Sequence, residues 1–196
     1  MRKFAGGGYD RDHMDLSSYL DQLISSVASA NRKTVVIMQS GTPVTIPWLE
    51  KVPSFVQAWY GGNEVGNAIA DVLLGDVNPS CRLTLSIPVR NEDNPAYLSH
   101  KSELGRTVYT DDVFAGYRHY EKVGKKVNFA FGHGLSYTSF EYDEHAVSKS
   151  ADDLEGKASV VIEAKNIGKL AGKEVVQIFV APPAGTATTG PVGELK

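Results

Sequence analysis

The sequence predicts an α/β fold, a partial α/β sandwich that is followed by a linker and an incomplete antiparallel β-sandwich. Apolar residues recur at helical spacing over residues 15–30, and a continuous apolar run follows at 34–38. Apolar and polar residues alternate over 157–166 and again over 174–180. A helix that leads into an uninterrupted apolar strand indicates a parallel sheet covered on both faces, and alternation indicates a sheet with one face in solvent.

The first predicted helix covers residues 15–30, and Asn31 is placed to end it. The strand that follows, 34–38, shows no alternation, so we expect both of its faces to be covered. The apolar face of the helix is predicted to consist of Leu16, Leu20, Leu23, Ile24 and Val27.

A second strand and helix are predicted next. Residues 55–59 form the strand, Gly61 and Gly62 turn the chain, and Asn63 caps a helix that Gly75 ends. A further strand at 83–87 is closed off by Pro88. The apolar face of this second helix is predicted to be Val65, Ala68, Ile69, Val72 and Leu73.

Residues 89–134 have no sustained periodicity but many aromatic residues, as expected for a functional or wrapping segment. Beyond them, strands at 157–166 and 174–180 are predicted to be joined by a turn at 166–168. These strands are too few to close a two-sheet core.

Composition excludes several classes of function. The 20 basic and 23 acidic residues give a net charge of −3 without a basic run, so a nucleic-acid partner is not expected. No apolar stretch is long enough to cross a membrane, and no signal peptide follows Met1, so the expected location is cytoplasmic if Met1 is the true start and unknown otherwise. A single cysteine, Cys81, cannot form an internal disulfide and is most simply a packed side chain.

Six short segments carry a recognisable pattern along the chain. They are Gly-Tyr-Asp-Arg at 8–11, Gln-Ser-Gly-Thr-Pro-Val at 39–44, Trp-Tyr-Gly-Gly-Asn-Glu at 59–64, Asp-Val-Leu-Leu-Gly-Asp-Val-Asn-Pro-Ser at 71–80, Tyr-Arg-His-Tyr at 117–120 and Phe-Gly-His-Gly-Leu-Ser-Tyr at 131–137. Each segment alone is a weak signal, but in order and spacing they together resemble, over nearly the whole chain, the C-terminal half of glycoside hydrolase family 3 enzymes of the β-glucosidase type.

This resemblance implies three regions: an α/β sandwich domain (partial) at 1–88, a wrapping linker at 89–137 and a truncated fibronectin type III-like domain at 138–196. In such enzymes a preceding (β/α)8 barrel binds most of the terminal sugar and carries an aspartate nucleophile. The sandwich domain contributes the acid/base glutamate, because a retaining glycosidase needs two carboxyl groups about 5 Å apart. A β-glucoside or oligosaccharide is the implied substrate, and no cofactor is implied.

At the acid/base position, which directly precedes the Gly-Tyr-Asp-Arg segment, this chain has Gly7, and glycine cannot donate a proton. The sequence therefore offers no catalytic residue. Asp10 and Arg11 are candidate substrate-binding residues at the rim of a sugar pocket, with Arg11 able to orient a hydroxyl or carboxylate. An ordinary ion pair that fixes the loop before the first helix is the simpler alternative.

Other motifs favour structural roles. The Gly-rich turn at 61–66 has the wrong spacing for a nucleotide loop, and no Gly-x-Ser-x-Gly elbow supports a serine hydrolase. The five histidines are scattered without metal-binding spacing, so no metal is expected, and His133 is interpreted as a turn residue. Tyr109, Phe114 and Tyr117 could stack on sugar at an outer subsite, although packing is the commoner use of such aromatics.

We therefore expect a parent enzyme that releases terminal glucose from β-glucosides, and a chain that is catalytically incomplete alone. A non-catalytic carbohydrate-binding or interaction module is the main alternative, and a nucleotide-binding domain is disfavoured by the glycine spacing. The surface that faces the barrel in relatives is expected to be uncovered here, so self-association through it is also expected.

Overall fold

The computed structural model describes residues 11, 13–100, 102, 104–149, 158–185 and 189–196. Contacts divide the chain into two compact units, which are described separately. Unit 1 comprises residues 1–66, 83–133 and 177–196, and unit 2 comprises 67–82 and 134–176. The domain boundaries expected from the sequence, 1–88, 89–137 and 138–196, stay a prediction.

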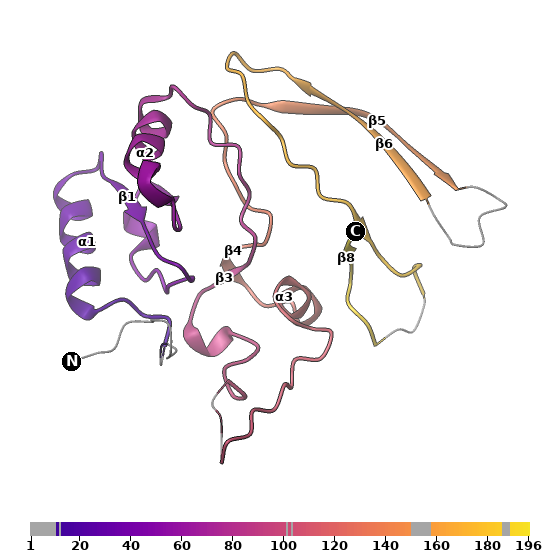
Figure 1. Ribbon diagram of the computed structural model, residues 1–196, viewed down its shortest axis with the longest axis horizontal. Helices are drawn as coiled ribbons and strands as arrows, with labels where there is room; N and C mark the ends of the chain where they lie inside the picture. Colours follow the sequence, from indigo (N-terminus) through magenta and orange to yellow (C-terminus); the bar gives the residue numbers. More distant parts are fainter. Residues whose placement is uncertain (1–10, 12, 101, 103, 150–157, 186–188) are drawn as a thin grey trace. The chain divides into compact units, whose positions relative to one another are not determined.

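Unit 1 opens with the predicted α/β elements (Figure 1). Helix α1 spans Ser18–Ala30 and is followed by strand β1, Val35–Met38, and strand β2, Ser54–Gln57. The two strands are parallel, with Val35 opposite Ser54 and Met38 opposite Gln57. Asn31 follows the last helical residue, as the sequence predicts, and its N–H donates to the Val27 carbonyl. The sequence prediction of a mixed α/β fold is confirmed.

The core of unit 1 lies around the segment that joins β1 to β2. Trp48 is 1% exposed, its ring packs edge-on against Phe55 at 5.8 Å, and its indole N–H donates to Asp21 at 3.0 Å. A short 3-10 helix, η1, spans Leu49–Lys51 directly after it. The buried apolar residues of this core are Ala28, Met38, Val44, Ile46, Trp48, Val52 and Ile87.

The predicted apolar face of α1 is partly wrong. Ile24 packs against the core and Ala28 is buried in it, one turn apart on the same side of the helix. Leu20, Leu23 and Val27 remain 37%, 45% and 46% exposed. The core therefore uses a narrower stripe of the helix than the sequence pattern indicates, because the short two-stranded sheet cannot cover the rest.

Strand β3 comprises just Ile87–Pro88 and pairs antiparallel with β4, Val127–Phe129. The strand predicted at 83–87 is therefore too long, and Pro88 lies inside β3 instead of after it. Leu83 forms two backbone hydrogen bonds of 2.8 Å, one from its N–H to the His133 carbonyl and one from the Gly132 N–H. This part of the segment is held as an irregular connection because its partner, 132–133, is itself a turn.

The aromatic linker contains structure that the sequence pattern does not reveal. A 3-10 helix, η3, spans Asn91–Asp93, and helix α3 spans Tyr117–Val123. Helix α3 is too short to show periodicity, and it ends at Gly124, whose φ of 63° suits glycine.

Asp93 fixes this linker from within. Its side chain is 4% exposed and forms ion pairs of 2.9 Å with Arg90 and Lys125. The hydrogen bonds from these two cations hold the pKa of Asp93 at about 2, below its ordinary value. Burial raises the pKa of nearby Tyr120 to about 12. The aspartate thus ties the two ends of the linker together as a charged group.

The last elements of unit 1 are β7, Phe179–Val180, and β8, Glu194–Leu195, which pair antiparallel. Tyr117 anchors them: its ring packs edge-on against Phe179 at 5.7 Å and stacks on Phe131 at 4.9 Å. Its hydroxyl accepts a hydrogen bond from the Leu195 N–H.

Helix α2, Val65–Leu74, lies mostly in unit 2 and begins after a 3-10 turn, η2, at Gly62–Glu64. Asn63 lies inside that turn, so the prediction that it caps the helix is wrong. Gly75 ends α2 with a φ of 87°, and its N–H donates to the Asp71 carbonyl at 3.1 Å.

The rest of unit 2 is dominated by a long hairpin of β5, Phe140–Lys149, and β6, Ala158–Asn166 (Figure 1). The expected pairing of 157–166 with 174–180 is wrong. Asn166 donates to the Leu170 carbonyl and the Lys173 N–H donates to Ser80, so the chain after β6 follows a polar loop instead of a strand.

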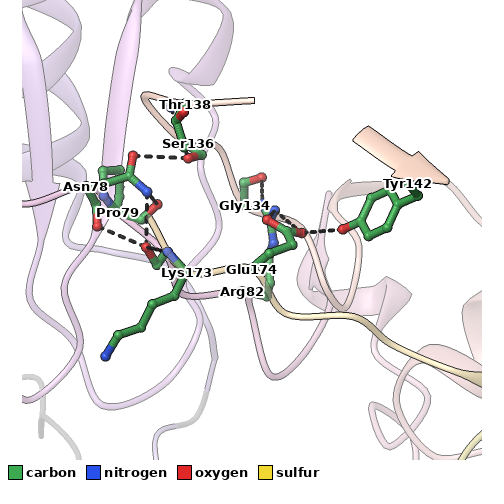
Figure 2. Close-up of polar contacts among 10 residues, drawn as sticks. Asn78, Pro79, Arg82, Gly134, Ser136, Thr138, Tyr142, Lys173 and Glu174 are labelled. Atoms are coloured by element: carbon green, nitrogen blue, oxygen red, sulfur yellow. Dashed lines mark hydrogen bonds and ion pairs between the residues drawn. The ribbon is translucent and has the colours of Figure 1, made fainter. Parts of the chain in front are cut away.

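Polar contacts organise unit 2 where apolar burial is scarce, and Figure 2 shows them. Arg82 donates to both carboxylate oxygens of Glu174, at 2.7 and 2.8 Å, and to the Gly134 carbonyl. The Tyr142 hydroxyl donates to the same carboxylate at 2.9 Å.

A second set of contacts, of which Figure 2 shows those with Ser136 and the neighbouring chain, centres on Asn78. Its side-chain carbonyl accepts from the Tyr137 N–H at 2.7 Å and from the Ser136 hydroxyl at 3.0 Å. Its amide donates to Ser80, the residue that also receives the Lys173 N–H. The Asn-Pro-Ser segment at 78–80 therefore has a structural role in unit 2, because its side chains form hydrogen bonds with residues 136, 137 and 173.

Candidate functional site

The carboxyl ends of β1 and β2 form the candidate site, which lies wholly in unit 1. Because the strands are parallel, the segments that follow them, 39–42 and 58–62, leave the sheet at the same edge. Ligands of open α/β sheets commonly bind at this edge. Two of the segments singled out from the sequence, Gln-Ser-Gly-Thr-Pro-Val and Trp-Tyr-Gly-Gly-Asn-Glu, are thereby brought to one edge.

Arg11 also reaches this edge. Its guanidinium donates to the Thr42 hydroxyl at 2.8 Å, and its other donors have no partner within the described part of the chain. Residues 14 and 15 are held by three hydrogen bonds. The Thr45 N–H donates to the Met14 carbonyl at 3.1 Å, and the Thr45 hydroxyl donates to the Asp15 carboxylate at 2.6 Å. The Met14 N–H donates to the side-chain oxygen of Asn91 at 3.3 Å. The contact with Thr42 therefore holds Arg11 at the edge through its side chain.

A chain of hydrogen bonds connects Thr42 to strand β2. The Ser40 hydroxyl donates to the Thr42 carbonyl at 2.8 Å and accepts from the Gln57 amide at 3.2 Å. The side-chain oxygen of Gln57 is buried and has no hydrogen-bond partner among the described residues. Ser40 and Gln57 were not identified from the sequence as site residues, because their roles depend on the strand pairing.

The segment after β2 is conformationally strained. Trp59 has a φ of 51°, in the left-handed region that bulky residues rarely adopt. Tyr60, which is 85% exposed, lies against Gly41, where a Cβ atom would come within 2.4 Å of the tyrosine ring carbons. A side chain at position 41 would have to displace the exposed Tyr60 ring, and the strain at Trp59 marks the edge as a functional candidate.

Acidic groups near this edge serve the structure. Asp15 accepts from Thr45, and Asp21 accepts from Trp48. Burial is the main cause that raises the pKa of Asp21, and the hydrogen bond from Trp48 opposes it. Gly7, the predicted acid/base position, and Asp10, a candidate substrate-binding residue, lie outside the described residues, so both stay predictions. In chemical terms the described edge can bind hydroxyl or carboxylate oxygens through Arg11.

The other sequence candidates divide between structure and surface. Tyr117 packs in unit 1, as does His133, whose ring lies 4.9 Å from that of Phe129 and whose carbonyl accepts from Leu83. Tyr109 is 92% exposed, and Cys81 is exposed rather than packed, contrary to expectation. Among the described residues no group of three or more His, Cys, Asp or Glu side chains could hold a metal ion. None of the helices in the described ranges is long and apolar enough to span a membrane.

Comparisons with known proteins extend these observations. Residues 1–137 match the C-terminal domain of glycosyl hydrolase family 3. The chain is 52% identical over 193 residues to a probable β-glucosidase I of Aspergillus fumigatus, covering 96% of this chain but 23% of that protein. It therefore spans less than a quarter of the length of this relative.

Two solved structures share the fold. The β-glucosidase of Kluyveromyces marxianus in complex with glucose matches with a TM-score of 0.90 at 50% identity, over 96% of this chain and 22% of that one. The family 3 β-glucosidase of Bifidobacterium adolescentis matches with a TM-score of 0.90 at 34% identity, over 97% and 28%. With the family's C-terminal domain matched over residues 1–137, the chain belongs to glycoside hydrolase family 3.

Proposed function

We propose that this chain is the C-terminal part of a β-glucosidase that hydrolyses terminal, non-reducing β-D-glucosyl residues of glucosides and short oligosaccharides. The observation that carries the proposal is 52% identity to a probable β-glucosidase across 96% of the chain. A bound glucose in the related Kluyveromyces structure supports the choice of sugar.

In this proposal the carboxyl edge of β1 and β2 forms part of the rim of the sugar site. Arg11, held by Thr42, donates hydrogen bonds to a substrate hydroxyl, with Asp10 beside it in sequence. Within the family pattern, residues 1–88 form the α/β sandwich domain, 89–137 the linker and 138–196 the fibronectin type III-like domain.

Turnover requires carboxyl groups that this chain is not expected to supply. A retaining mechanism uses a nucleophile and an acid/base residue about 5 Å apart. The resemblance assigns the nucleophile to a barrel domain and aligns the acid/base position with Gly7. The 196-residue chain alone should therefore leave an aryl β-glucoside unhydrolysed, with no cofactor able to restore activity.

The assignment of Gly7 is tested in a chimera that carries the barrel of the Kluyveromyces enzyme in front of this chain. Gly7→Glu should accelerate hydrolysis of an alkyl glucoside, whose leaving group needs a proton, by about a hundredfold to ten-thousandfold. An activated aryl glucoside should gain far less at the glycosylation step. Azide should rescue the glycine form, because it attacks the glycosyl-enzyme without a base.

The matched control is Gly6→Glu, which introduces the same carboxyl group one position earlier and should leave the alkyl glucoside slow. If Gly7→Glu accelerates both substrates equally, or accelerates neither of them although the chimera is folded, the acid/base residue lies elsewhere. Arg11→Ala in the same chimera should raise KM, because Arg11 is proposed to bind substrate without taking part in bond cleavage.

A second candidate function is a non-catalytic carbohydrate-binding module, which the glycine at position 7 favours. It requires sugar binding by the Gly7 chimera without hydrolysis of activated glucosides, even when azide is present. Self-association through the surface that faces the barrel in relatives also stays a proposal.

A further inference from the structure

Unit 1 contains a pocket that takes no part in the candidate site. It is a hollow that is open to solvent, with a volume of about 590 Å³, within the range typical of small-molecule sites. Most of its walls come from the segment before α3 and from α3 itself, with Pro95 and Thr189 completing the lining. The residues of this linker pocket used below are Asp111, Phe114, His119 and Lys122.

Asp111 gives the linker pocket an unsatisfied acceptor. One oxygen of its carboxylate, Oδ1, is shielded from solvent and has no hydrogen-bond partner within the described ranges of the chain. Unpaired buried carboxylate oxygens are unfavourable, because the hydration that they lose is not replaced. The Asp111 backbone is fixed by the Phe114 N–H, which donates to its carbonyl at 2.8 Å. Because Oδ1 is shielded, a ligand that supplies hydroxyl donors restores the missing bond only when the Asp111 side chain turns this oxygen toward the pocket.

Phe114 and two side chains of α3 add an apolar platform and hydrogen-bond donors to the lining. The Lys122 ammonium lies 5.9 Å from the centroid of the Phe114 ring and donates to the Gly190 carbonyl at 2.9 Å. His119 is three positions earlier on α3, so its imidazole lies on the same side of the helix as Lys122. The pocket thus offers an aromatic ring, a charged acceptor and hydrogen-bond donors within one small volume.

We propose that the linker pocket binds a neutral carbohydrate, with Asp111 accepting from sugar hydroxyls and Phe114 packing against the apolar face of a pyranose ring. Sugars combine many hydroxyl donors with an apolar ring face, which matches this lining. A phosphorylated ligand fits less well, since the Asp111 carboxylate would repel it. The proposal goes beyond hydrolysis, because none of these side chains belongs to the edge of β1 and β2.

The test is titration of the 196-residue chain with cellobiose, followed by backbone amide NMR and calorimetry. Amide shifts should concentrate in 110–123. Asp111→Asn should weaken binding about tenfold, since it removes a charged acceptor, and Phe114→Ala about fivefold, since it removes the platform. Asp112→Asn is the matched control: Asp112 is exposed, has a φ of 49° that asparagine tolerates, and should leave affinity unchanged.

Several results would overturn the proposal. One is that the folded chain does not bind cellobiose at millimolar concentration. Another is that neither Asp111→Asn nor Phe114→Ala changes the affinity for cellobiose. A third is that the chain binds inorganic phosphate more tightly than cellobiose. If Asp111→Asn loosens the fold, His119→Gln is measured in its place, since glutamine keeps a hydrogen-bond donor and an acceptor on α3. A change in its affinity for cellobiose supports the proposal, and an unchanged affinity contradicts it. The titration measures binding without turnover, so a negative result would not contradict the proposed hydrolase function. Likewise, a negative result with the Gly7 chimera would not contradict sugar binding in the linker pocket.

Discussion

The α/β part of unit 1 and the hairpin of unit 2 are stabilised by different means. In unit 1, Val44, Trp48 and Ile87 are 2%, 1% and 1% exposed. In the hairpin, Val147 and Val161 are 60% and 62% exposed, although the two strands pair over nearly their full length. Apolar burial therefore supports the first region, whereas backbone pairing and polar contacts support the second.

This difference explains where a site can be built. A buried core holds its side chains in fixed positions, so loops at its edge, such as 39–42 and 58–62, can place Arg11 and Thr42 precisely. A hairpin with both faces largely exposed lacks such support. Among the described contacts, the Tyr142 hydroxyl of β5 donates to Glu174, which is itself held by Arg82.

The largest predicted effect lies in the core. Trp48→Ala should lower the free energy of unfolding by about 3–5 kcal/mol, because it leaves a large cavity and removes the hydrogen bond to Asp21. Urea unfolding followed by circular dichroism measures the change. Trp48→Phe is the control, since it keeps most of the ring volume and should cost markedly less. Equal losses for both variants would mean that the hydrogen bond, not the apolar volume, stabilises this region.

The contrast between the regions also explains which elements the sequence reveals. The α/β elements α1, β1, β2 and α2 are recognisable because helical periodicity and uninterrupted apolar runs report directly on burial. Helix α3 has seven residues, too few for a periodic pattern, and Lys125 just beyond it pairs with Asp93, which is distant in sequence. The pairing of β6 with β5 was missed because alternation indicates a strand but does not identify its partner.

The candidate site was likewise foreseen only in part. Arg11 was identified from its motif, and the structure adds Thr42, Ser40 and Gln57, whose proximity follows from the parallel register of β1 and β2. The strain at Trp59 has no sequence signal, since nothing in its residue type suggests a positive φ. Residue identity thus indicates which chemistry is available, while strand register determines which groups act together.

A medium effect is expected in unit 2, where Glu174→Gln weakens the contact with Arg82. The Arg82 and Glu174 side chains are 19% and 12% exposed, so the loss should be about 1–2 kcal/mol, seen as faster hydrogen exchange of β5 and β6 amides. The hydrogen bonds from Arg82 lower the pKa of Glu174, so this contribution is present above its ordinary pKa of 4.5 and is lost as the pH falls below it. Glu141→Gln, an exposed charge on β5, should change neither exchange nor its pH dependence. Faster exchange in the core of unit 1 as well would show that the two regions are not stabilised separately.

The smallest effect makes the comparison sharpest, because the same substitution is placed in both regions. Val161→Ala in β6 removes two methyl groups that are already largely in solvent, so no cavity forms and the cost should stay within about 0.5 kcal/mol, mostly from the lower strand propensity of alanine. Val44→Ala removes the same atoms from a 2% exposed position, where the surrounding core cannot collapse around the void, and should cost about 1.5–3 kcal/mol. Urea unfolding of both variants under one set of conditions gives the difference directly. Similar losses at the two positions would mean that the exposed face of the hairpin is covered in solution, and the division between a core-supported and a polar-supported region would then have to be abandoned.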